Sequence, residues 1–223
     1  MKTKLTLLVL SFFTCVAMGY GQVPTWMLTT FGRGGTYSRS SSDGSFVFPQ
    51  WKRNQVAFPA FLSTTTDSSV LGNLSGKTIS ATVTITATPN AVFVFGGELP
   101  RWNTGPFPAS GRLWFSTTAQ TYDVQDGIDN EHKYWWSRHS QFICTNNLGT
   151  VTISDSFDPS HWTSANGRPG NDPLFIDKFN AAVSNVRQIG VSFGGGCCFD
   201  IGVGLKPQSG SSASFRLNAF NVQ

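Results

Sequence analysis

Charged side chains are scarce in this chain. Asp, Glu, Lys and Arg together make up 13% of the 223 residues, against about 25% in an average soluble domain. The formal net charge is +4, and it falls by two to +2 if Lys2 and Lys4 are removed with an N-terminal leader. So small a positive surplus excludes nucleic acid as an expected partner.

Long apolar runs are also missing. A membrane-spanning helix needs about 20 apolar residues, whereas the longest run here covers only residues 5–16. That run follows two lysines and precedes the small residues Ala17 and Gly19, an order typical of a signal peptide. We therefore expect residues 1–19 to be a signal peptide and residues 20–223 to form a single domain. The mature protein is expected to be secreted, extracellular or periplasmic if retained, with no membrane span.

Cysteine is rare as well. Loss of Cys15 with the signal peptide leaves Cys144, Cys197 and Cys198, an odd number. In an oxidising compartment we expect Cys144 to pair with Cys197 or Cys198, which leaves one thiol free or joined to a second chain in a disulfide-linked dimer. A ring between the two adjacent cysteines is a strained alternative. Adjacent cysteines lack the CxxC spacing with which two thiolates bind one zinc ion.

Only two glutamates are present, Glu98 and Glu131. Glycoside hydrolysis requires two carboxyl groups about 5 to 10 Å apart, and neither glutamate lies in the E-x-D-x-E pattern of jelly-roll glucanases. Ser192 is a candidate nucleophile, because it lies in a GxSxG sequence. In the hydrolases that use this motif a helix follows the serine and the catalytic histidine comes later in the chain. Here no helix is expected after Ser192, and all three histidines precede it. We expect no catalytic residues, and a glycoside hydrolase is an alternative function.

The chain is rich in short segments in which apolar and polar residues alternate. In residues 78–87, isoleucine, valine and alanine alternate with threonine and serine, as in a strand with one buried face. We expect further strands at 26–31, 45–48, 91–95, 112–117, 133–137, 151–153, 189–193 and 212–222. Turns rich in Gly, Pro, Asn and Asp separate them. The pattern predicts an all-β fold, a two-sheet antiparallel β-sandwich of the jelly-roll type.

One short helix is expected near residues 173–185. Asn171 or Asp172 can cap it, Pro173 fits its first turn, and its apolar residues recur at helical spacing. A single further turn is expected after Asp158. We expect the Gly- and Ser-rich stretch from residue 32 to 44 to be a loop.

Oxygen ligands are concentrated in one segment that contains Asp123, Asp126 and Asp129. Calcium binds carboxylate oxygens with tolerant geometry, so these residues are a candidate structural calcium site. The alternative is a polar hairpin loop with its turn at Asp126-Gly127.

Seven tryptophans are many for a chain of this length. Tyr134 and Trp136 share one strand face and Trp135 takes the other, so at least one side is accounted for by core packing. Trp51, Trp102 and Trp114 lie beside polar residues and are the candidate ligand-binding side chains, because an exposed indole can stack on the apolar face of a sugar ring.

Four segments together carry a resemblance to a known group: Leu71-Gly-Asn-Leu-Ser-Gly-Lys-Thr-Ile-Ser-Ala-Thr82, Tyr134-Trp-Trp-Ser137, Phe157-Asp-Pro-Ser-His-Trp162 and Ile189-Gly-Val-Ser-Phe-Gly-Gly-Gly196. The chain resembles uncharacterised exported bacterial proteins with a jelly roll similar to carbohydrate-binding modules. The resemblance implies the fold. From the polar, aromatic surface and by analogy with this group, we expect a non-catalytic protein that binds a neutral polysaccharide or other glycan through surface aromatics. The alternative is a structural or adhesive protein of the cell surface.

Overall fold

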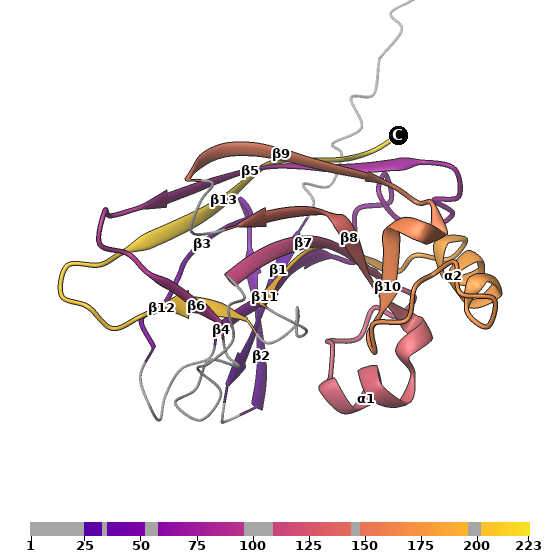
Figure 1. Ribbon diagram of the computed structural model, residues 1–223. Coiled ribbons are helices and arrows are strands. Elements are labelled where there is room, and N and C mark those ends of the chain that lie inside the picture. Colours follow the sequence, from indigo (N-terminus) through magenta and orange to yellow (C-terminus); the bar gives the residue numbers. More distant parts are fainter. Residues whose placement is uncertain (1–24, 33–34, 52–57, 96–108, 144–147, 196–201) are drawn as a thin grey trace, which may run out of the picture.

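The computed structural model describes residues 25–32, 35–51, 58–95, 109–143, 148–195 and 202–223. Over these residues the chain forms two main antiparallel sheets that face each other (Figure 1). The predicted all-β sandwich is confirmed. Among the described residues, no helix is long and apolar enough to cross a membrane.

Seven strands form the larger sheet in the order β10-β8-β7-β11-β4-β1-β2. Their bounds are β10 Trp162–Ser164, β8 Tyr134–Ile143, β7 Ala109–Ser116, β11 Gln188–Gly195, β4 Phe58–Thr64, β1 Trp26–Gly32 and β2 Gly35–Ser41. The smaller sheet has the order β3-β13-β5-β9, with bounds β3 Ser45–Val47, β13 Ala213–Val222, β5 Thr78–Ala87 and β9 Gly149–Ser156. β6 (Phe93–Phe95) and β12 (Val203–Leu205) form a separate pair.

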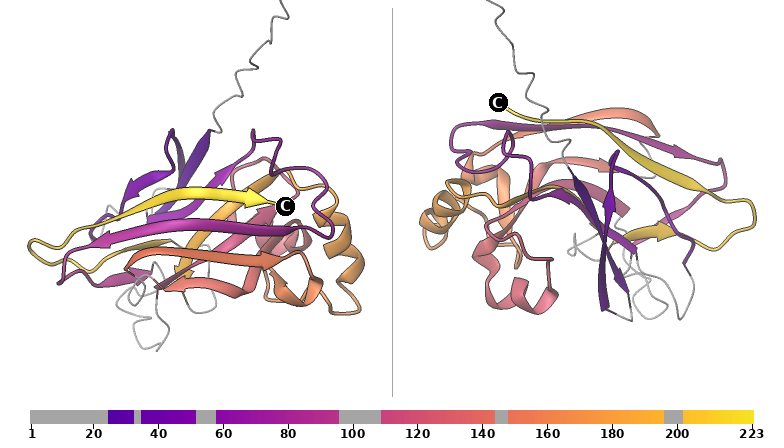
Figure 2. Two further views of the ribbon diagram at one scale, coloured as in Figure 1. Left: turned by 90° about the horizontal axis from the view of Figure 1, so that it is seen from above. Right: turned by 180° about the vertical axis from the view of Figure 1, so that it is seen from behind.

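Strand β5 shows why the sandwich closes. Its isoleucine, alanine and valine side chains are buried at alternate positions, and its threonines point away from the core. Thr82 and Thr84 pair across to Thr152 and Thr150 of β9, each with an Oγ1–Oγ1 distance of 2.8 Å. Figure 2 (left) shows β13, β5 and β9 side by side over the larger sheet. The prediction for 78–87 is therefore confirmed residue by residue.

Phenylalanines from both sheets interlock at the centre of the core. Phe215 of β13 stacks on Phe46 of β3, with ring centroids 5.0 Å apart. It also meets Phe193 of β11 edge to face at 5.1 Å, and Phe142 of β8 lies 6.1 Å away. Such aromatic pairs contribute about 0.5–1.5 kcal/mol each beyond the area they bury. These contacts hold the two sheets together.

A second aromatic cluster covers the opposite face of the larger sheet. Its buried members are Ala60, Phe61, Trp114, Tyr122, Tyr134 and Trp136. Because strand side chains alternate between faces, Phe115 of β7 joins the central core while its neighbour Trp114 joins this outer cluster. The larger sheet is thus buried on both faces at this end.

A short helix, α1 (Val124–Asp129), lies beside the outer cluster, where its Asp126 accepts a hydrogen bond from the Tyr134 hydroxyl. The alternative of a hairpin loop with its turn at Asp126-Gly127 is wrong. The Asp123 carboxylate accepts hydrogen bonds from the backbone N–H groups of Gln125 and Asp126 and so caps the helix N-terminus. An aspartate at this position satisfies N–H groups that have no partner inside the helix.

The helix expected near 173–185 is α2, which spans Ile176–Val183. It starts later than expected, although the Asp172 carboxylate does accept the Leu174 N–H at 2.9 Å. Phe179 anchors it against Trp135 of β8, with ring centroids 5.0 Å apart. The single turn expected after Asp158 is also present, as the 3₁₀ helix η2 (Pro159–His161).

The prediction of a loop over residues 32–44 is wrong. Residues 35–41 form β2, which pairs with β1 along its whole length. The side chains of residues 36–40 are exposed, so the strand carries no apolar alternation that would reveal it. Residues 33 and 34 lie outside the described residues, as do the expected signal peptide 1–19 and the cysteines Cys144, Cys197 and Cys198.

Candidate functional site

Of the three predicted ligand-binding tryptophans, the structure describes Trp51 and Trp114. Trp114 is fully buried, with its ring 4.6 Å from that of Phe61 and 6.2 Å from that of Trp136. The expectation of an exposed Trp114 is wrong, because the polar-looking face of β7 is covered by the outer aromatic cluster.

Trp51 and Trp102 have separate outcomes. Trp51 is half-buried, and its backbone N–H donates to the carbonyl of Leu205 at 2.7 Å. Trp102 lies outside the described residues, and so does Glu98. The other glutamate, Glu131, accepts a hydrogen bond from the Ser164 hydroxyl at 2.8 Å.

The calcium candidates have other partners. Asp123 caps α1, and Asp129 accepts the side-chain amide of Gln125 at 3.1 Å. The Asp126 carboxylate accepts hydrogen bonds from Tyr134, Asn130 and Lys133. Among the described residues, the three carboxylates are not grouped as metal ligands. The contacts that the structure gives them are those of helix capping and anchoring, and the calcium site stays a prediction.

The anchor between Asp126 and Tyr134 predicts a pH-dependent stability. The Tyr134 hydroxyl, followed by Asn130 and Lys133, lowers the pKa of Asp126. A carboxylate with a lowered pKa contributes stability that is present above about pH 4 and is lost as the pH falls through its folded value.

We expect Tyr134→Phe to destabilise the fold by about 1 kcal/mol at pH 7, and by less at pH 3, in urea unfolding. Asp129→Asn, which removes an exposed carboxylate from the same helix, is the control. An equal loss from Tyr134→Phe at both pH values would contradict the prediction.

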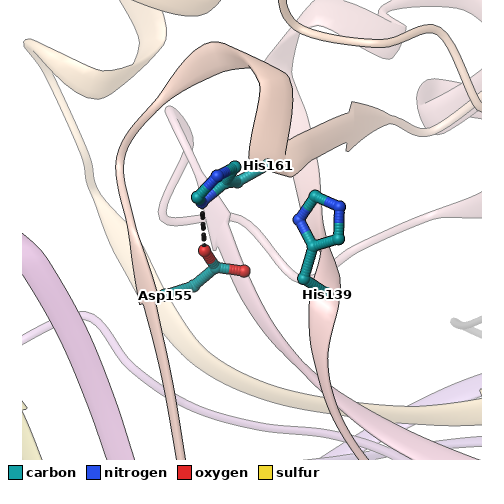
Figure 3. A group of neighbouring side chains, drawn as sticks. All are labelled: His139, Asp155 and His161. Atoms are coloured by element: carbon teal, nitrogen blue, oxygen red, sulfur yellow. Dashed lines mark hydrogen bonds and ion pairs between the residues drawn. The ribbon is translucent and has the colours of Figure 1, made fainter.

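The group of three metal-ligating side chains found within the described residues is His139, Asp155 and His161. They come from β8, β9 and η2 respectively, so the group joins the edge of the smaller sheet to the larger one. Their candidate ligand atoms all lie within 4.8 Å of one another. Figure 3 shows the two imidazoles and the carboxylate turned toward a common space.

Local structure places each of the three. In β9 the side chains of Ile153 and Asp155 face inward while Ser154 faces out, so Asp155 occupies a core-facing position. The Asp158 carboxylate accepts the Ser160 N–H at 2.8 Å and thereby caps the turn that carries His161. His139 lies at the irregularity in the pairing of β8 with β7, between Trp136, which pairs with Trp114, and Gln141, which pairs with Arg112.

One oxygen of Asp155 is used and the other is not. Its Oδ1 lies 2.6 Å from Nδ1 of His161 and accepts the Ser156 N–H at 3.0 Å. Its Oδ2 is buried and has no hydrogen-bond partner among the described residues. The Asp155 side chain as a whole is only 4% exposed. The His139 ring is exposed and meets the His161 ring edge to face, with centroids 4.9 Å apart.

A hollow lies at the end of the larger sheet that is formed by β1 and β2. It is lined by Leu28, Thr30, Tyr37, Ser38, Arg39, Val47, Pro49 and Pro59. Tyr37 is 57% exposed on β2. The hydroxyl of Ser38 bonds to that of Thr29 at 3.0 Å, which ties β2 to β1 beside it. Because strand side chains alternate between faces, Tyr37 and Arg39 point to the same face as their partners Thr30 and Leu28, whereas the Ser38 hydroxyl points to the other face with Thr29. An aromatic ring, the Thr30 hydroxyl and a guanidinium thus line the hollow.

A comparison of the chain with protein-family models, curated proteins and solved structures found no match. The candidate sites of the described chain are the hollow beside Tyr37 and the His139–Asp155–His161 group.

Proposed function

We propose that this is an exported, non-catalytic protein that binds a neutral glycan in the hollow beside Tyr37. The observation that carries the proposal is the exposed Tyr37 ring in one hollow with Thr30 and Arg39. A sugar ring presents an apolar face, which an aromatic side chain covers, and hydroxyl groups at its edge, which need polar partners. The arginine can donate several hydrogen bonds and has no acceptor of its own.

The chain's composition supports this choice of ligand. With 13% charged residues, it offers few ion-pairing groups, so a neutral ligand suits it better than a strongly charged one. The expected secretion would place such a protein in contact with polysaccharides.

The test is a depletion assay of the purified protein with a panel of insoluble and soluble polysaccharides. We expect at least one glycan to deplete the wild type, and Tyr37→Ala to weaken that binding about tenfold, the equivalent of about 1.4 kcal/mol. Tyr37→Phe, which keeps the ring, should retain most of the affinity. Leu174→Ala, at an exposed apolar side chain elsewhere, is the control.

Each contrary outcome favours a different function. Absence of depletion by every glycan overturns the proposal. If self-association through an intermolecular disulfide is then found on a non-reducing gel, the structural or adhesive alternative replaces it. Release of new reducing ends, abolished by Glu131→Gln or Glu98→Gln, would instead indicate a glycoside hydrolase.

A further inference from the structure

We propose that His139, Asp155 and His161 bind one divalent transition-metal ion of the zinc type. The group lies on β8, β9 and η2, whereas the hollow beside Tyr37 is lined mainly from β1 and β2, which lie at the opposite side of the larger sheet. The inference is therefore independent of the proposed glycan binding.

The donor set selects the kind of ion. Two imidazole nitrogens and one carboxylate oxygen are ligands that zinc and its neighbours in the first transition row bind. Calcium takes about six to eight oxygen ligands, and this group offers carboxylate oxygens from Asp155 alone. Three protein ligands also leave one position of a tetrahedral ion for water, on the side of the exposed His139 ring.

The distances are close to those of a bound site. Ligand atoms about 2.0–2.1 Å from a tetrahedral ion lie about 3.3 Å from one another. The candidate atoms here lie within 4.8 Å, so the outermost pair must approach by at most about 1.5 Å. Rotation of the exposed His139 side chain can supply that movement without disturbing a strand.

The buried oxygen of Asp155 is the independent observation that points to a ligand. A hydrogen-bonded His–Asp pair accounts for Oδ1, which contacts His161 and Ser156. It does not account for Oδ2, which is buried without a partner in the described structure and lies on the side of the carboxylate that faces His139 (Figure 3). A carboxylate oxygen left unpaired in the interior is costly, and a cation between Asp155 and His139 would satisfy it.

A bound ion would act as a clamp between the two sheets. β9 is the outermost described strand of the smaller sheet and β8 belongs to the larger one. In the described part of the chain, no hydrogen-bonded ladder joins β8 to β9, so the metal would connect them where backbone pairing does not. Arg138, the neighbour of His139 in sequence, donates from its guanidinium to the Ser160 carbonyl at 3.4 Å.

The experiment uses the full mature chain, treated with chelator and with its thiols alkylated so that cysteines cannot bind the ion. Calorimetric titration with zinc chloride should show one site per chain with micromolar or tighter affinity. Zinc at about 100 times the dissociation constant should raise the melting temperature by about 5 to 10 °C. Cobalt(II) should give the visible absorption bands of a tetrahedral site.

The variants distinguish this group from other zinc ligands. His139→Ala replaces an exposed side chain and should fold normally, yet weaken zinc binding at least tenfold. Asp155→Asn should do the same while keeping the shape of the side chain. His132→Ala, at the third histidine, which is exposed and outside the group, is the matched control and should bind zinc like the wild type.

Three results would overturn the proposal. They are zinc affinity weaker than millimolar in the alkylated wild type, equal losses from His132→Ala and His139→Ala, and binding that depends on unmodified thiols. Each would mean that the three side chains form an ordinary hydrogen-bonded group. None of them bears on glycan binding at Tyr37.

Discussion

Trp162→Ala is expected to lower the free energy of unfolding by about 3–5 kcal/mol, the range for a fully buried aromatic side chain. The Trp162 ring stacks on Phe157 with centroids 5.3 Å apart and planes 3° from parallel, and Phe115 meets it edge to face at 4.9 Å. Its indole N–H donates to the Ser156 carbonyl at 2.8 Å. Truncation therefore leaves a cavity and an unpaired carbonyl together.

Urea unfolding at pH 7 measures this loss, and Trp51→Ala is the matched control. Trp51 is only half-buried, and its backbone bond to Leu205 survives the substitution, so its loss should be less than half as large. Trp162→Phe should recover part of the stability, because it keeps a ring against Phe157 while giving up the bond to Ser156. Equal losses at Trp51 and Trp162 would show that η2 and β10 are not part of the cooperative core.

Gly190→Ala is expected to cost about 3 kcal/mol or more, at the upper end of the range for overpacking. Gly190 lies in β11, between β4 and β7, and pairs with Ser63. A Cβ atom there would lie 2.1 Å from the Leu62 carbonyl oxygen and 2.7 Å from the Ser63 Cα. Both are backbone atoms, so no side-chain rotation can relieve the contact, and the central strands must separate.

Gly167→Ala is the control for the glycine substitution. At Gly167 nothing lies within 4 Å of an added Cβ, but φ is +75°, so the only expected cost is that of the left-handed conformation, about 1–2 kcal/mol. In thermal melts, the melting temperature should therefore be highest for the wild type, lower for Gly167→Ala and lowest for Gly190→Ala. A Gly190→Ala variant that melts with or above Gly167→Ala would mean that β4 and β11 can move apart at little cost.

How much of the fold could be predicted depends on which strands carry a one-sided apolar pattern. β5 alternates between core and solvent, so its bounds were predicted without error. β2 has exposed side chains and β4 is buried at all seven positions, so neither alternates, and neither was predicted. α1 has six residues, too few for helical spacing to be recognised, and its capping aspartate was interpreted as a calcium ligand.

The candidate sites were harder to predict for a different reason. Trp114 has polar neighbours in sequence, and only the outer aromatic cluster shows that its face is covered. His139, Asp155 and His161 stand 16 and 6 residues apart on separate elements, with no local motif. The one usable signal was Asp155 at an apolar position of the alternating strand β9, since a carboxylate facing the core needs a partner.

That inward carboxylate has a consequence for how the molecule behaves at high concentration. No described strand pairs with the outer backbone groups of β9, and such a strand can add to the same strand of a second molecule and begin aggregation. Natural sheets often prevent this with a charge that a second strand would trap away from water. Asp155 cannot act in this way, because its carboxylate points into the core and is only 4% exposed before any strand is added. The described edge of β9 is therefore a candidate site of self-association at high protein concentration.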